Sequence, residues 1–321
     1  MTVLDLPGWA VPLVTSSRAA GEDPGCALDL ARQYGTRLPQ PGGGQTAGRV
    51  LEAHTDALAI LAEAGAPPPD GTWGVFAAEA APHRLTASAG PGGPVTLTGV
   101  KPWCSLAGLL DSALVTAHGP DGRQLYRVSL RDPTVTVDPP EGWVARGLRT
   151  VTSVAVRFSG TAAEPVGGPG WYLTRPGFAW GGMGVAACWY GGALGLRTAI
   201  AAAAARRGSD LTSMLLGATD ISLYGCAAAF GHAASLIDSG AARGAAGELL
   251  GLRLRGLVAD AAEQALRHAG HALGPAPLAF DEEHARRAAD LELYIRQHHA
   301  ERDLARLGSL LTADDGAGAA R

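Results

Sequence analysis

The hydrophobic period of this 321-residue chain changes twice along its length. Between 72 and 166 the sequence breaks into short runs rich in β-branched residues, such as VTLTGVKPW, QLYRVSLR and VTSVAVRFSG. Turn signals such as GPGG and GPDGR separate these runs, and the pattern predicts an antiparallel sheet or barrel. On both sides the apolar residues return to helical spacing, so the predicted fold class is α+β and mainly α.

The helical segments follow from the same pattern. Before the strands we predict a short helix over 27–34 and a strong one over 47–64, where Thr46 is positioned as the N-cap. After the strands we predict a bundle of four long antiparallel helices, then a loop or a final helix over 297–311. The four helices are expected at 181–206, 212–238, 243–269 and 282–296.

These segments predict four parts of the chain. They are a short helical N-terminal domain over 1–71, a β-barrel domain over 72–177, a C-terminal helical bundle over 178–312 and a disordered tail over 313–321.

Composition narrows the range of partners. A formal net charge of −4 shows no basic excess, so we expect neither nucleic acid nor a membrane as a partner. The apolar stretch Phe178–Ala205 is long enough to ask about a membrane span, but its glycines and Arg197 favour a packed core helix. The first residues lack a basic region followed by an apolar run, so no signal peptide is predicted and we expect a cytoplasmic protein.

The four cysteines are Cys26, Cys104, Cys188 and Cys226, widely spaced and in apolar surroundings. Because no CxxC pattern is present, we predict buried, reduced thiols and no disulfide or metal site.

One stretch of the strand region, Thr96–Ala117, suggests a ligand. The only lysine of the chain, Lys101, is followed by Pro102 and then Trp-Cys-Ser. On a regular strand Trp103 and Ser105 project to the same face. Such a face suits a flat aromatic ligand, whose ring would pack on Trp103 while Ser105 bonds its polar edge.

This stretch resembles the flavin-contacting strand of the acyl-CoA dehydrogenase family, which reads G-x-K-x-W-I-T, then a small-residue turn and an acidic residue. The matching residues are Gly99, Lys101, Trp103, Cys104, Ser105 and Asp111. The segments Gly191–Arg207, Leu236–Gly240 and Ala265–Gly274 resemble parts of the family's helical bundle. The order of helices, barrel and bundle also agrees, and the resemblance covers about residues 25–311.

The resemblance implies an FAD-dependent oxidoreductase that acts on a small molecule or an acyl thioester and forms a homodimer or homotetramer. Trp103 and Ser105 then contact the flavin ring. Arg207 falls where the family holds the flavin diphosphate of the partner subunit, and Arg267 and Gly270 fall near the adenine end of the partner's FAD.

The chain also departs from the family. Ala78 and Glu79 stand where a Thr-Glu pair contacts flavin, the Gly-Ser that follows is absent, and Met183 stands where an arginine is common. The N-terminal helical domain is truncated, so the substrate pocket is expected to be more open, or filled from elsewhere.

The catalytic base is also different. The family places a glutamate before a glycine in the loop after the fourth bundle helix, but Tyr294–Gly308 has no Glu-Gly pair. The base position falls near His298, and Glu301 is the nearby carboxylate; a histidine is suited to proton transfer near neutrality.

Three functions stay open at this point. One is a dehydrogenase acting on a CH–CH group of an acyl thioester or related carbon acid. A second is a monooxygenase that uses reduced flavin, and a third is a non-enzymatic scaffold that has lost flavin. A di-iron site is not expected, because the bundle lacks paired Glu-x-x-His motifs.

Overall fold

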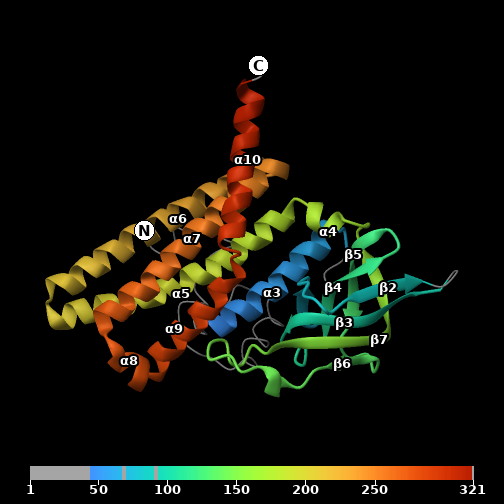
Figure 1. Cartoon of the computed structure of the whole chain (residues 1–321), viewed down its shortest axis with the longest axis horizontal. Helices are drawn as coiled ribbons and strands as arrows, with labels where there is room; N and C mark the ends of the chain where they lie inside the picture. The colour runs from blue at the N-terminus through green and yellow to red at the C-terminus, as the bar shows by residue number, and fades with distance from the viewer. Residues whose placement is uncertain (1–43, 67–69, 90–92, 320–321) are drawn as a thin grey trace.

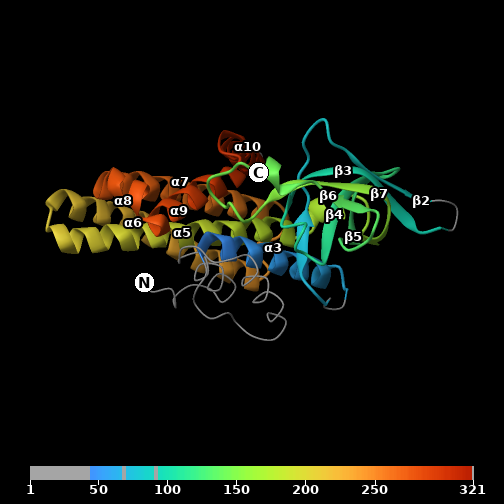
Figure 2. The ribbon, with the colours of Figure 1, turned by 90° about the horizontal axis from the view of Figure 1, so that it is seen from below.

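The computed structural model describes residues 44–66, 70–89 and 93–319. It is elongated, with a helical bundle at one end and a β-barrel at the other (Figure 1). The helix predicted over 27–34 and Cys26 lie outside the described residues. The helix predicted over 47–64 is α3 (Gly44–Glu63), which lies along the bundle and reaches the barrel (Figure 2).

Seven strands form the barrel region. They are β1 (Trp73–Phe76), β2 (Leu85–Ala89), β3 (Val95–Ser105), β4 (Ser112–Gly119), β5 (Gly122–Ser129), β6 (Val135–Val137) and β7 (Ser153–Val166). The path β4-β2-β3-β7-β5 returns to β4, so the predicted barrel is closed. Most pairings are antiparallel as predicted, but β1 and β2 each pair with β4 in parallel.

The only lysine of the chain is buried in this region. Lys101 is 1% exposed, and its Nζ donates to Glu79 Oε1 at 2.7 Å and to Thr116 Oγ1 at 2.8 Å. Burial lowers the pKa of Lys101, while the hydrogen bond that Lys101 donates to Glu79 opposes that shift. Two polar partners therefore satisfy an ammonium group that water does not reach.

The helices after the barrel agree closely with the predicted bundle. They are α4 (Trp171–Thr174), α5 (Gly177–Arg207), α6 (Asp210–Asp238), α7 (Gly244–Leu273), α8 (Pro275–Phe280), α9 (Glu282–Tyr294) and α10 (Glu301–Ala319). The described residues also form two short 3₁₀ helices: η2 (Pro140–Gly142) between β6 and β7, and η3 (Ile295–Gln297) after α9. α5 is the central helix, because it packs against α3, α6, α7 and α9.

One predicted segment differs. The tail predicted to be disordered from 313 continues α10 as a helix to Ala319. Once the first turns of a helix have formed, each added residue costs little, even where Gly316 and Gly318 are weak helix formers. Figure 1 shows α10 leading away from the bundle.

Among the described residues, one helix is long and apolar enough to cross a membrane, and it is α6 rather than α5. Core helices of water-soluble proteins share both properties, so a single helix of this kind is weak evidence for a span.

The cysteines agree with the predicted thiols where they are described. Cys104 and Cys226 are buried thiols, and burial raises the pKa of Cys226 to about 12. Cys188 is also buried, and its Sγ lies 3.5 Å from the carbonyl oxygen of Gly48. No cluster of metal-ligating side chains occurs in 44–66, 70–89 or 93–319.

The loop before β7 packs against α9 and so holds the barrel against the bundle. The Leu148 N–H donates to the buried carboxylate of Asp290 on α9 at 2.5 Å. The backbone approaches closely at Gly147, where an added Cβ would lie 1.9 Å from the Ala289 carbonyl oxygen. Only glycine leaves room for this contact, which fixes the loop on α9.

We therefore expect Gly147→Ala to lower the free energy of unfolding by about 2–4 kcal/mol, because backbone atoms on α9 cannot move aside cheaply. Gly142→Ala is the matched control, since no atom lies within 4 Å of an added Cβ there. Urea unfolding of the two variants and the parent protein measures the difference. Equal stability of the two variants would contradict the contact.

Candidate functional site

Trp103 is displayed by a bulge in β3. The register of β3 against β7 shifts between Lys101 and Cys104. Trp103 has a φ of 58°, and its side chain is 58% exposed. A bulge adds a residue to one strand and turns a side chain in a new direction. The regular alternation from which Trp103 and Ser105 are expected to share one face is therefore broken here, and Trp103 is exposed while Ser105 is buried.

Trp103 lies on an open hollow of about 840 Å³. Trp143 meets it edge to face, with ring centroids 6.5 Å apart. Ser153 and Leu293 also line this space, which we call the Trp103 hollow. Its surface combines two large aromatic rings with a few polar groups, so it suits a flat ring system.

A chain of polar contacts leads from this hollow into the helices. Ser153 and Ser105 share a hydrogen bond of 2.8 Å, and Arg49 Nη2 donates to the Ser105 hydroxyl at 3.3 Å. Arg49 also donates to Glu52 one turn along α3, and Glu52 accepts from the Tyr294 hydroxyl at 3.3 Å. Ser105 is thus connected to buried charges on α3.

A second cavity, of about 710 Å³, lies among α3, the start of α5, α7 and the loop before α10, and we call it the helical cavity. Charged residues from α3, the end of α4, α7 and α10 line it: Glu52, Asp56, Arg175, Glu248, Arg255, Asp303 and Arg306. Glycines of α5 make room for them, since a Cβ at Gly181 would lie 2.8 Å from Asp56 Oδ1.

Asp56 and Arg175 lie side by side in the wall of this cavity as an ion pair without a hydrogen bond. Arg175 Nη1 donates to Glu63 at 2.8 Å, while Nη2 lies 3.7 Å from Asp56 Oδ1. The Arg175 guanidinium also lies over the Tyr172 ring, 5.4 Å from its centroid. Burial raises the pKa of Asp56 to about 7, with nearby Glu52 adding to the shift and Arg175 opposing it.

The loop predicted to carry the base divides into buried and exposed parts. The His298 ring is largely buried 6.2 Å from the Trp189 ring, and its Nε2 lies 3.7 Å from Asp303 Oδ2. Burial lowers the pKa of His298, so its ring is neutral near pH 7. His299 and Asp303 line the helical cavity. Glu301 is exposed in the first turn of α10 and is not part of that lining.

Comparison with solved structures identifies the fold. The structure of butyryl-CoA dehydrogenase from Megasphaera elsdenii matches 95% of this chain and 88% of its own, with a TM-score of 0.73 and 15% identity. This chain has the acyl-CoA dehydrogenase fold. The predicted fold class and the resemblance to that family are therefore confirmed at the level of architecture.

Two further similar structures contain a bound flavin. One is a glutaryl-CoA dehydrogenase from Mycobacterium smegmatis in complex with FADH2, with 16% identity, 90% and 88% coverage and a TM-score of 0.72. The other is FMN-bound TdsC from Paenibacillus sp. A11-2, with 16% identity, 94% and 83% coverage and a TM-score of 0.69. No protein-family model and no curated protein matches the chain.

The Trp103 hollow fits the ring end of a flavin, because it offers an exposed indole and a serine hydroxyl. Its described lining contains no arginine or lysine, so the phosphates of a flavin need cations from another surface. Of the residues predicted for that role, Arg207 is the last residue of α5. Arg267 and Gly270 lie on α7 close to α8, at the end of this acyl-CoA dehydrogenase fold remote from the barrel (Figure 1).

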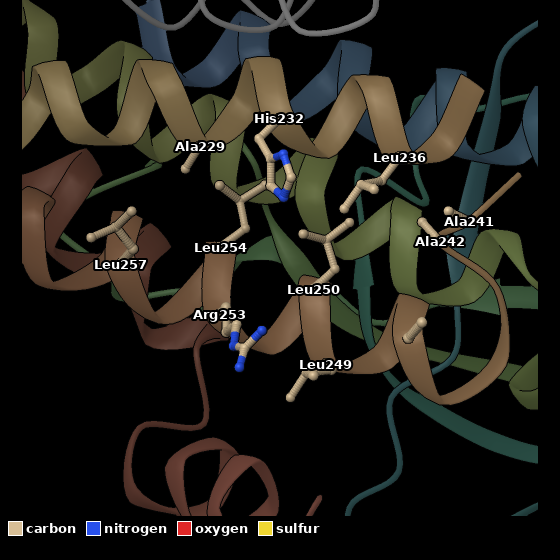
Figure 3. A pocket seen from close by; sticks show the side chains of 11 residues that line it. Ala229, His232, Leu236, Ala241, Ala242, Leu249, Leu250, Arg253, Leu254 and Leu257 are labelled. Carbon is tan, nitrogen blue, oxygen red and sulfur yellow. The ribbon is translucent and has the colours of Figure 1, made fainter. Parts of the chain in front are cut away.

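A third hollow, of about 400 Å³, lies between α6 and α7. Figure 3 shows His232 of α6 pointing toward Leu250 and Leu254 of α7, while Arg253 points away from it. The surface is mostly apolar and brings no pair of reactive groups together, so it is not a candidate for chemistry.

Sequence reasoning missed Asp56, Arg175 and Asp303. Two features of the sequence could have pointed to Asp56. Glu52, Asp56 and Glu63 are spaced by four and seven residues, which places three carboxylates on one face of a helix. The glycine-rich start of α5, GFAWGGMG, indicates that another element approaches its backbone.

The raised pKa of Asp56 predicts a pH effect on stability. In the folded state the Asp56 carboxyl keeps its proton up to about pH 7, whereas in the unfolded chain it releases the proton near its ordinary pKa of 3.8. The stability that the protonated carboxyl contributes is therefore lost as the pH rises from about 4 to about 7. The amide of Asp56→Asn has nearly the shape of the protonated carboxyl group and stays uncharged at every pH. We expect it to exceed the parent protein in free energy of unfolding at pH 8, by at most about 4 kcal/mol, and to match it near pH 4.

Urea unfolding between pH 4 and pH 8 measures this difference. Asp220→Asn, at an exposed aspartate of α6, is the control and should follow the parent curve. An Asp56→Asn curve that also parallels the parent at every pH would show that Asp56 is ionised throughout.

Proposed function

We propose that this protein is a flavin-dependent oxidoreductase that binds the flavin ring, as part of FAD, against the exposed face of Trp103. The observation that carries the proposal is the bulge in β3, which holds a non-glycine residue at a φ of 58° and leaves a large aromatic side chain 58% exposed. Such backbone strain persists where the surrounding structure maintains it, commonly at functional sites. The flavin-bound structures of the same fold support this reading.

A bound flavin supplies the site that accepts or delivers hydride. The residues of this chain position the ring and polarise it: Trp103 packs on the ring, and Ser153 offers a hydroxyl beside it. Ser105 lies behind Ser153 and shares a hydrogen bond of 2.8 Å with it. Arg49 lies behind Ser105 as a buried cation, with a pKa raised by Glu52 against the effect of burial. A fixed positive charge at this position favours negative charge that develops near the ring.

The dehydrogenase form of the proposal takes a CH–CH group of an acyl thioester or related carbon acid as substrate. The proton goes to a base from the loop before α10. His298 suits this role better than Glu301, because its ring is neutral near pH 7 and held between Trp189 and Asp303, whereas Glu301 is exposed.

A reduced-flavin monooxygenase is the second candidate. The charged helical cavity favours it, because an unbranched acyl chain would bury apolar surface against ionised groups. The dibenzothiophene monooxygenase TdsC, which has also been solved in complex with FMN and indole, shares the fold.

We also propose a homodimer or homotetramer. α6 exposes an apolar stripe at helical spacing: Leu211, Met214, Ile221 and Tyr224. A second copy would cover this stripe and could bring Arg207, Arg267 and Gly270 toward the partner's flavin.

Titration of the purified protein with FAD, and separately with FMN, tests flavin binding through quenching of tryptophan fluorescence. We expect FAD to bind, and Trp103→Ala to weaken it about tenfold or more, which corresponds to about 1.4 kcal/mol of lost ring contact. Phe280→Ala removes an aromatic side chain that is 91% exposed on α8 and is the control. If neither flavin binds, the oxidoreductase proposal is wrong and the protein is a non-enzymatic scaffold that has lost flavin.

Turnover separates the two reactions. Oxidation of butyryl-CoA with an artificial electron acceptor identifies a dehydrogenase, and oxidation of indole with reduced FMN and oxygen identifies a monooxygenase. In the reaction that proceeds, we expect His298→Ala to lower the rate about a hundredfold or more at unchanged flavin content, as for a lost base. Glu301→Gln should stay close to the parent rate, and a large loss in that variant alone would reverse the assignment.

A further inference from the structure

We propose that Asp56 and Arg175 form a recognition site in the helical cavity for a neutral amide, either a carboxamide or a lactam, carried by a compact ligand. The role of this ligand as a substrate rests on the proposed function, but its binding to this cavity does not. The proposal begins from two polar groups that face a cavity and have not bonded to each other.

The first step is the inventory of hydrogen bonds. Of the Arg175 nitrogens, Nη1 is bonded to Glu63, Nε is buried without a partner, and Nη2 has no hydrogen bond within the described part of the chain. The Asp56 carboxyl also has no hydrogen bond there, and its nearest cation is Nη2 at 3.7 Å. Buried polar groups are almost always paired, so the guanidinium, whose Nε has no partner, calls for one, and the Asp56 side chain, 20% exposed beside it, is accessible to the same ligand.

The second step is the position of Arg175. Its side chain is 2% exposed, and Glu63 on one edge and the Tyr172 ring on one face hold it in place. Gly181 leaves space at Asp56, because an added Cβ would lie 2.8 Å from its Oδ1. The guanidinium is therefore fixed, and the Asp56 carboxyl lies beside it at the wall of the cavity.

The third step is charge. Above about pH 7, where the Asp56 carboxyl loses its proton, a carboxylate on the ligand would be repelled by Asp56 and an ammonium by Arg175, so each would gain one attraction and one repulsion. A methyl end would leave both groups desolvated and unpaired. An amide carries an acceptor and a donor side by side, and it can accept from Nη2 while donating to Asp56.

The fourth step is shape. Tyr172, Phe178, Val185 and Leu252 supply an apolar wall to the same cavity. Its volume of about 710 Å³ lies in the usual range for small-molecule sites. The ligand is therefore a compact apolar or aromatic body with one amide group.

A matched set of probes tests the proposal on the full chain without flavin. The probes are 4-fluorobenzamide, 4-fluorobenzoate, 4-fluorobenzylamine and 4-fluorotoluene, and fluorine NMR line widths at pH 8, where Asp56 is ionised, give their dissociation constants. We expect the benzamide to bind about tenfold or more tightly than each of the others. Any other probe binding best, or no probe binding, overturns the proposal without the use of a variant.

Two variants then locate the site. Asp56→Leu should weaken the benzamide about tenfold and reduce its advantage over the toluene, because the acceptor is gone. Asp220→Leu makes the same change at an exposed ion pair with Arg197 on α6 and should leave the affinity unchanged. Equal affinities in both variants would show that the benzamide binds elsewhere.

The flavin titration makes the two proposals separable. Benzamide binding without flavin binding supports the amide site and contradicts the oxidoreductase. Flavin binding without benzamide binding supports the oxidoreductase and contradicts the amide site.

Discussion

The close packing of α5 against its neighbours is the interaction on which the rest of the structure depends. The middle of this helix, from 186 to 196, is largely buried, and its first turns contain several glycines. At Gly177 an added Cβ would meet the Arg175 and Glu63 side chains, and at Gly182 it would meet Arg255. The absence of side chains here lets charged groups from α3 and α7 lie directly on the helix backbone.

The charges beside α5 are an uncommon way to fill a protein interior. Buried ion pairs seldom add much stability, because removing charges from water offsets most of their attraction. Arg255 shows how the cost is met in one case: it donates to two backbone carbonyls, those of Gly182 and Gln297, and lies over the Trp189 ring. Asp56 and Arg175 lack such complete pairing, which separates them from the structural part of the network.

The sequence predicts the helices and strands well, but it does not predict the strand bulge at Trp103 or the side chains that meet in the helical cavity. The change of hydrophobic period identifies the barrel and the bundle because burial repeats every two residues on strands and about every 3.6 on helices. The bulge at Trp103 has no such signal, since a positive φ is usually announced by glycine or asparagine. The helical cavity was equally hidden, because Asp56 and Arg175 are far apart in sequence and meet only when α3 packs beside α5.

The burial of Lys101 has a consequence for the chemistry of the surface. As the only lysine of the chain, it leaves arginine as the only cationic side chain facing water whose charge persists at neutral and alkaline pH. That surface charge cannot be altered by acetylation of lysine. A reagent that acylates amines reaches the ε-amino group only when the barrel opens, so the rate of modification of Lys101 measures the local opening of β3 from its neighbours.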